Sequence, residues 1–183
     1  MSDYSAQERQ QLLQLARHSI VAHLRGESLP HPDLPDRLGE PRGAFCTLHL
    51  HGKLRGCIGY VEPLFPLWQT VVQTAAAAAT DDPRFAPLTL GELAHVHIEL
   101  SVMSPLRTIT PDEVEVGVHG LMISQGSKRG LLLPQVATEW GFDRETFLSG
   151  TCHKAGLRGD AWQHGATIQA FTAEVFGEPE QRH

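Results

Sequence analysis

Apolar residues recur every three or four positions in two long stretches of the chain, and this spacing predicts two amphipathic helices. The first follows Ser5-Ala6-Gln7-Glu8, a capping box in which the serine and glutamate side chains accept backbone N–H groups, and it ends near Gly26. The second begins at Pro66, because proline is favoured in a first helical turn, and it ends before Pro83. Residues 27–42 contain four prolines and therefore predict a connecting loop.

Shorter apolar runs, several of them alternating with polar residues, predict strands in much of the remaining chain. A third helix is expected from Asp143, which can cap it, to Gly156. Because helices and strands do not alternate regularly, we predict one domain over residues 1–183 with an α+β fold, in which helices flank a mainly antiparallel β-sheet. The expected strands are residues 43–50, 54–61, 96–102, 117–123, 129–134 and 168–176.

The first two strands are expected to form the central hairpin of the sheet, with the second helix covering one sheet face. Their turn contains His51-Gly52. A two-residue turn places Cys57 on the same face as Arg55 and Cys46. It places His49 on the opposite face, which argues against a Cys–His pair within the hairpin unless a bulge changes the register.

Length, net charge and cysteine content limit the partners and the cellular location that we expect for this protein. The chain has 183 residues, of which 41% are hydrophobic, and a chain of this length buries roughly 70% of its unfolded surface. The net charge of −6 argues against nucleic-acid and anionic-membrane partners, because these need a basic surface. Three cysteines without paired spacing suit a reducing compartment, and neither a signal peptide nor a membrane-spanning stretch is evident. We therefore expect a cytoplasmic protein that binds neither membranes nor nucleic acid.

The stretch Leu54-Arg55-Gly56-Cys57-Ile58-Gly59 carries the strongest candidate chemistry. Glycine weakens a strand and often marks a bulge or the close approach of another group, so Gly56 and Gly59 are expected to line a ligand pocket. A cationic side chain beside a cysteine favours the reactive thiolate form. We interpret Cys57 as a candidate catalytic thiol, with Arg55 holding an anionic group of a small ligand. The simpler alternative is that Cys57 packs as a small apolar residue.

Four other side chains are secondary candidates for the same site. Glu99 points away from the apolar face of its strand, so it orients Arg55 or Arg84, acts as a base, or is simply exposed. His119 either lines the pocket in a catalytic role or is a hydrogen-bonded structural residue. Arg84 is expected to bind the ligand, and Phe85 to supply an apolar wall.

The remaining cysteines and histidines do not predict a metal centre. Cys46 is either a resolving thiol for Cys57 or a core residue, and Cys152 lies on the apolar side of its helix. His95 and His97 share a strand face, but spacing places no third ligand near them. We therefore expect no metal, no cofactor and three free thiols.

Seven segments taken together resemble one known family over nearly the whole chain. They are, in order, Leu54-Arg55-Gly56-Cys57-Ile58-Gly59, Asp82-Pro83-Arg84-Phe85, residues 99–105, residues 116–121, residues 130–136, residues 152–157 and Trp162. The chain is similar to the AMMECR domain family, also called AmmeMemoRadiSam system protein A. The resemblance places the family's cysteine at Cys57 and its arginine at Arg55. Gln135, within the fifth segment, is added to the predicted ligand-binding residues.

The resemblance implies an α+β unit with a smaller subdomain, but it does not supply a reaction. It also implies two partners, a Memo-like protein and a radical SAM protein, because their genes neighbour those of the family. Two functions remain open. The first is an enzyme or protein-modifying component that uses Cys57, and the second is a non-catalytic binding or scaffold module that acts with these partners.

Overall fold

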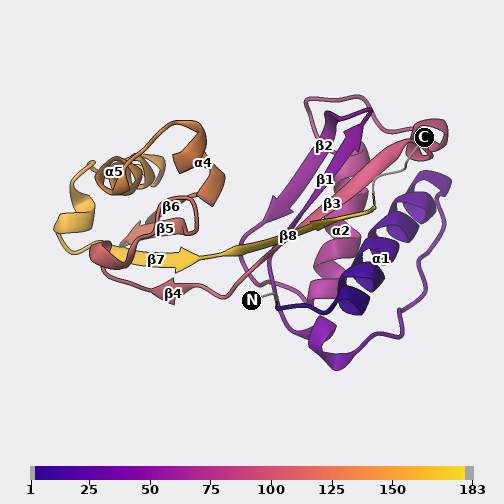
Figure 1. The fold of residues 1–183 in the computed structure, drawn as a ribbon, viewed down its shortest axis with the longest axis horizontal. Helices are drawn as coiled ribbons and strands as arrows, with labels where there is room; N and C mark the ends of the chain where they lie inside the picture. Colours follow the sequence, from indigo (N-terminus) through magenta and orange to yellow (C-terminus); the bar gives the residue numbers. More distant parts are fainter. Residues whose placement is uncertain (1–2, 180–183) are drawn as a thin grey trace. The chain divides into compact units, whose positions relative to one another are not determined.

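The computed structural model describes residues 3–179, which divide into two compact units. The first unit comprises residues 3–103 and 174–179, and the second comprises residues 104–173. Each unit has one four-stranded sheet and its own apolar core (Figure 1). The α-helices and antiparallel sheets of the described residues confirm the predicted α+β class. No helix within this part of the chain is both long and apolar enough to cross a membrane.

The first unit packs two long helices against one face of its sheet (Figure 1). The elements are α1 (Ala6–Arg25), η1 (Asp36–Gly39), β1 (Ala44–Leu50), β2 (Lys53–Tyr60), α2 (Leu67–Thr80), α3 (Leu90–Leu93), β3 (Val96–Met103) and β8 (Ala173–Gly177). The strand order is β2-β1-β3-β8, so only one strand of the predicted central hairpin is internal, and β2 is an edge strand. We call the sheet face opposite the two helices the outer face.

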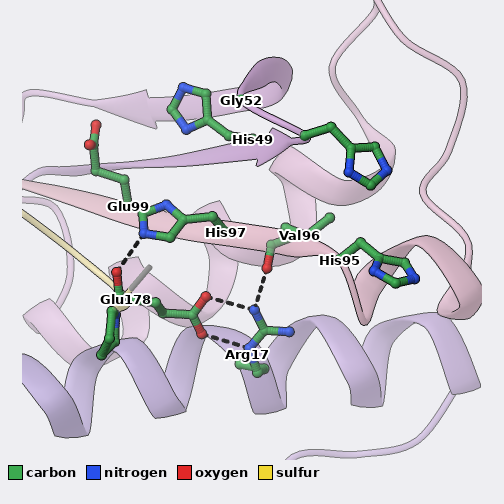
Figure 2. Close-up of a pocket in the computed structure, with 10 residues that line it drawn as sticks. Arg17, His49, Gly52, His95, Val96, His97, Glu99 and Glu178 are labelled. Atoms are coloured by element: carbon green, nitrogen blue, oxygen red, sulfur yellow. Dashed lines mark hydrogen bonds and ion pairs between the residues drawn. The ribbon is translucent and has the colours of Figure 1, made fainter. Parts of the chain in front are cut away.

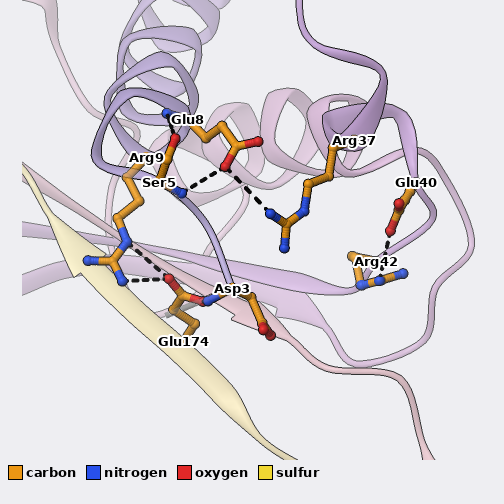
Figure 3. A network of polar contacts seen from close by, with 8 residues as sticks. All are labelled: Asp3, Ser5, Glu8, Arg9, Arg37, Glu40, Arg42 and Glu174. Atoms are coloured by element: carbon orange, nitrogen blue, oxygen red, sulfur yellow. Dashed lines mark hydrogen bonds and ion pairs between the residues drawn. The ribbon is translucent and has the colours of Figure 1, made fainter. Parts of the chain in front are cut away.

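Polar contacts fix the start of α1, as the predicted capping box requires. Ser5 Oγ accepts the N–H of Glu8 at 3.1 Å, and the Glu8 carboxylate accepts the N–H of Ser5 at 2.7 Å. Ion pairs extend the contact, because Arg9 lies 2.6 Å from Glu174 of β8 and Arg37 lies 3.9 Å from Glu8 (Figure 3). The predicted start of the first helix is confirmed.

The hairpin contains a β-bulge that the sequence did not predict. Its turn lies at His51-Gly52, as expected, and both residues have positive φ (51° and 77°), as this tight turn requires. The register then shifts between Leu48 and His49, because Arg55 has no partner on β1. Arg55 is therefore the extra residue of a bulge, which changes the facing of every β2 residue beyond it.

The predicted facing of the two hairpin cysteines is wrong for this reason. Cys57 pairs with Thr47, and both lie on the outer face. Cys46 pairs with Ile58 and is buried in the core between the sheet and the helices. Cys46 and Cys57 thus point to opposite sides of the sheet, and both are free thiols.

The second unit consists of β4 (Arg107–Thr108), η2 (Pro111–Glu113), β5 (Gly120–Gln125), β6 (Lys128–Leu132), α4 (Pro134–Glu139), α5 (Arg144–Lys154), η3 (Ala161–Gln163) and β7 (Thr167–Phe171). It packs its longest helix, α5, against a sheet with the strand order β4-β7-β5-β6. The buried centre of the unit includes Phe147, Leu121 and Ile123.

Two predicted strands differ from the observed ones. The strand expected at 117–123 begins only at Gly120, because Val118 and His119 donate their N–H groups to the Glu115 carbonyl in a turn. The strand expected at 168–176 is interrupted at Thr172 and forms β7 in one sheet and β8 in the other. The second interruption does not follow from the apolar pattern, because Phe171 and Ala173 flank Thr172.

Candidate functional site

Cys57 lies in a row of three side chains across the outer face of the first unit. Thr47 is its partner on β1, and Glu99 of β3 is the partner of Thr47. Cys57 Sγ lies 3.2 Å from Thr47 Oγ1, which is within hydrogen-bonding distance for sulfur. Cys57 is half-buried, whereas Cys46 and Cys152 are fully buried. Of the three thiols, Cys57 is therefore the one that reagents and ligands can reach.

A buried carboxylate joins Cys57 to Arg84 at the edge of β2. The Asp82 side chain is only 3% exposed, and its Oδ2 accepts the N–H of Cys57 at 3.0 Å. The same oxygen accepts from Arg84 Nη2 at 2.7 Å, and Oδ1 accepts from Arg84 Nε at 3.0 Å. The hydrogen bond from Arg84, followed by that from Cys57, holds the pKa of Asp82 well below its ordinary range. Asp82 therefore fixes a guanidinium two hydrogen bonds away from the Cys57 backbone.

The two arginines near the thiol differ in how their donors are used. Arg55 donates Nε and Nη2 to Glu92 (3.2 and 3.3 Å) and Nη1 to the Ala86 carbonyl (2.9 Å), and its side chain is 14% exposed. Arg84 donates Nε and Nη2 to Asp82, and its side chain is 55% exposed. Arg55 thus ties the bulge of β2 to the segment around α3. Arg84 presents the more accessible cation, with its Nη1 bonded to no other described residue.

Phe85 lies against both guanidinium groups. Its ring centroid is 5.9 Å from Cζ of Arg55 and 5.5 Å from Cζ of Arg84, within the range of cation–π contacts. The Phe85 ring therefore contacts both cationic side chains. Its predicted role as an apolar wall for a ligand stays a prediction.

The two glycines of the motif allow close backbone packing. A Cβ on Gly56 would lie 2.1 Å from the Ala78 carbonyl oxygen of α2, so only glycine lets the helix approach β2 here. A Cβ on Gly59 would lie 2.3 Å from the Ala44 carbonyl oxygen of β1. These contacts account for both glycines through packing, and their predicted ligand contacts stay predictions.

His119 and Gln135 belong to the second unit, where they can be described by themselves. His119 Nδ1 accepts the N–H of Glu115 at 3.0 Å, the hydrogen bond expected of a structural histidine. Gln135 lies in the first turn of α4, and its carbonyl accepts the hydroxyl of Thr138 at 2.9 Å. That His119 and Gln135 take part in a ligand site stays a prediction.

An open pocket of about 810 Å³ lies at the turn end of the first unit's sheet. His49 of β1 is directly opposite His97 of β3 (Figure 2). One side is formed by an ion pair between Arg17 and Glu178, whose atoms approach to 2.6 Å. The lining residues are Arg17, His49, His51, Gly52, His95, Val96, His97, Glu99, Glu178 and Pro179. Despite the histidines, no three Cys, His, Asp or Glu side chains of residues 3–179 are grouped so as to hold a metal ion.

Sequence reasoning missed three residues that shape the site. Asp82 and Glu92 are the partners of Arg84 and Arg55, so Glu99, the partner suggested by the sequence, orients neither arginine. Thr47 reaches Cys57 only because of the bulge. The Asp-x-Arg spacing at residues 82–84 was a usable signal for the first pair, whereas the contact with Glu92 spans a long separation in sequence.

Comparison with known proteins identifies the family. The AMMECR1 family model matches residues 13–176. A protein of Methanothermobacter thermautotrophicus is 46% identical over 184 residues, covering 95% of this chain and 96% of the relative, and protein PF1979 of Pyrococcus furiosus is 44% identical, covering 91% and 86%. The crystal structure of the uncharacterized protein PH0010 from Pyrococcus horikoshii matches with a TM-score of 0.80 and 39% identity, covering 96% of this chain and 93% of that one. The chain therefore belongs to the AMMECR1 family.

Proposed function

We propose that this protein uses Cys57 as a reactive thiol toward a small ligand whose anionic group is bound by Arg84. The observation that most supports the proposal is the position of the Asp82 carboxylate. One of its oxygens accepts hydrogen bonds from both the Cys57 N–H and the Arg84 guanidinium. A cation is thereby held next to the one half-buried cysteine.

Arg84 suits an anionic ligand better than Arg55 does. An arginine recognises carboxylate or phosphate through the donors of its planar guanidinium. Most donors of Arg55 are already bonded to Glu92 and to backbone carbonyls. Arg84 is more exposed, and its Nη1 has no partner among residues 3–179, with Phe85 as an apolar surface beside it.

The reaction class that fits is attack of the Cys57 sulfur on an electrophilic centre of the ligand. A bond forms to sulfur, the leaving group departs with its electron pair, and the thiol proton passes to solvent. If the electrophilic centre is an acyl group, the product is a thioester, and in an enzyme water would attack its carbonyl carbon, releasing the acid and regenerating the Cys57 thiol. In a protein-modifying component, a nucleophilic group of the acceptor protein would replace water and take the acyl group. The same Cys57 site would serve either function.

The test compares two alkylating reagents of similar size and different charge. Native protein at pH 8.0 is treated with iodoacetate, which is anionic, or iodoacetamide, which is neutral, and modification of each cysteine is followed by peptide mass spectrometry. We expect the iodoacetate-to-iodoacetamide rate ratio at Cys57 to be about threefold higher in the native chain than in the urea-unfolded chain, because only the folded protein holds the guanidinium nearby. An unreactive Cys57, or equal ratios in both states, would refute the proposal.

A non-catalytic binding module is the second candidate function. Leu64 and Phe65, between β2 and α2, are 61% and 38% exposed, and neighbouring apolar side chains of this kind occur at protein interfaces. The family resemblance suggests the Memo-like and radical SAM proteins as partners. Co-purification of either with the chain, lost on the double substitution Leu64→Ser and Phe65→Ser but kept on Cys57→Ser, would favour this function over thiol chemistry.

A further inference from the structure

The pocket at the turn end of the first unit's sheet contains one carboxylate, that of Glu99, that has no partner among residues 3–179. Glu178 is bound by Arg17 through two contacts of 2.6 Å and by the N–H of Ile98 at 2.9 Å. Glu99 also lines the pocket, but no hydrogen bond or ion pair joins its carboxylate to another residue of the described chain. A half-buried carboxylate without a partner is unfavourable in the absence of a ligand or water that binds it.

The remaining lining leaves the Glu99 carboxylate as the dominant charge. Arg17 is neutralised by Glu178, and it also donates to the carbonyls of Leu93 and Val96. His97 is held by the Glu178 carbonyl at 2.5 Å through Nε2. Imidazole nitrogens and a carboxylate together offer acceptors for the N–H groups of an ammonium or guanidinium ion.

Glu99 also belongs to the row that contains Cys57. Thr47 separates the two residues, each on its own strand, so their backbones lie about 10 Å apart across the outer face. Arg84 lies beyond Cys57, bonded through Asp82 to the outer edge of β2. The thiol therefore lies between a cation at the sheet edge and a free anion two strands away.

We infer that Glu99, with His49 and His97 beside it, is a subsite for a cationic group of the same ligand whose reacting centre meets Cys57. The inference rests on the proposed function and deepens it, because the ligand then carries an anion toward Arg84 and a cation toward Glu99. The ligand class is a zwitterion whose opposite charges lie more than about 10 Å apart, such as a short peptide. A purely anionic ligand would leave Glu99 without a partner.

Charged thiol reagents test the inference on the full chain. The probes are 2-(trimethylammonio)ethyl methanethiosulfonate, which is cationic, and 2-sulfonatoethyl methanethiosulfonate, which is anionic. The Cys57 thiolate attacks the sulfenyl sulfur, a disulfide bond forms, and methanesulfinate leaves with the electron pair. Rates at pH 8.0 are measured for Cys57 by mass spectrometry in the starting protein and in Glu99→Gln, Glu99→Asp and Asp33→Asn variants. Asp33 is an exposed carboxylate of the same unit outside the pocket and serves as the matched control.

We expect Glu99→Gln to lower the ratio of cationic to anionic rates about threefold to tenfold, since one charge within roughly 10 Å of the reagent is removed. Glu99→Asp keeps the charge and should keep most of the ratio, and Asp33→Asn should leave it unchanged. Circular dichroism confirms that each variant is folded. If Cys57 reacts but Glu99→Gln leaves the ratio unchanged, the cationic subsite is refuted and the reactive thiol stands. If Cys57 reacts with neither probe until the chain is unfolded, both proposals fall.

Discussion

Each unit places an aspartate and an arginine two residues apart near a cysteine, but the two pairs differ in burial. In the first unit, the Asp82 side chain is 3% exposed and binds the backbone of Cys57. In the second, Arg158 and Asp160 are 87% and 42% exposed, and their closest atoms are 3.4 Å apart. The pairs are in opposite sequence order, and the contact is shorter, at 2.7 Å, where the carboxylate is buried and backbone donors complete its hydrogen bonds.

Cys152 and Cys57, the cysteines near the two pairs, also differ in burial. Cys152, whose thiol is influenced by Asp160 of the second pair, is fully buried, and burial is the main cause that raises the pKa of that thiol. Cys57 is half-buried beside the first pair. A cysteine near an Asp–Arg pair is thus not enough to suggest a reactive site, because the thiol must also be accessible.

Removing each carboxylate gives the largest expected difference between the two regions. Asp82→Asn replaces an acceptor of four hydrogen bonds, three from Arg84 and one from the Cys57 N–H, with an amide that also carries donors. We expect a clear fall in the urea midpoint of unfolding. Asp160→Asn, at an exposed position, should change the free energy of unfolding by about 0.5 kcal/mol or less. Equal shifts for the two variants would show that burial of Asp82 does not distinguish the pairs.

The stability of the protein in acid should also depend on Asp82 and not on Asp160. Because the pKa of Asp82 is lowered in the folded state, its contribution to stability is complete above the ordinary carboxyl pKa of about 4. That contribution is lost as the pH falls below this value toward the folded-state pKa. We expect the free energy of unfolding to fall less steeply between about pH 5 and pH 2 in Asp82→Asn than in the starting protein. Asp160→Asn is the control, and an unchanged slope in Asp82→Asn would contradict the assignment.

The sequence predicted the elements that depend on local patterns. The capping box at Ser5 and Glu8 and the turn at His51-Gly52 involve neighbouring residues, and both are present. The fold class followed from the order of such elements. Local sequence signals were sufficient because the hydrogen bonds of the capping box and of the turn join residues that are only a few positions apart.

The site was harder to predict because it depends on one irregularity and on distant contacts. The bulge at Arg55 reverses the facing of Cys57, and alternation of side chains cannot reveal an extra residue within a strand. The motif arginine was expected to bind the anion, but Glu92, far along the chain, occupies most of its donors. The break at Thr172 is equally invisible, since apolar residues flank it on both sides.

The central claim is that Arg84, rather than Arg55, is the cation that acts on the Cys57 site. The direct measurement is the iodoacetate-to-iodoacetamide rate ratio at Cys57 in Arg84→Gln and Arg55→Gln, with Arg158→Gln as the matched arginine from the exposed pair. We expect a ratio lowered about threefold in Arg84→Gln and unchanged in Arg158→Gln. In Arg55→Gln we expect a nearly unchanged ratio together with a lower unfolding midpoint, because the ion pair with Glu92 is lost. A ratio that falls in Arg55→Gln and stays constant in Arg84→Gln would show that Arg55, and not Arg84, acts on Cys57.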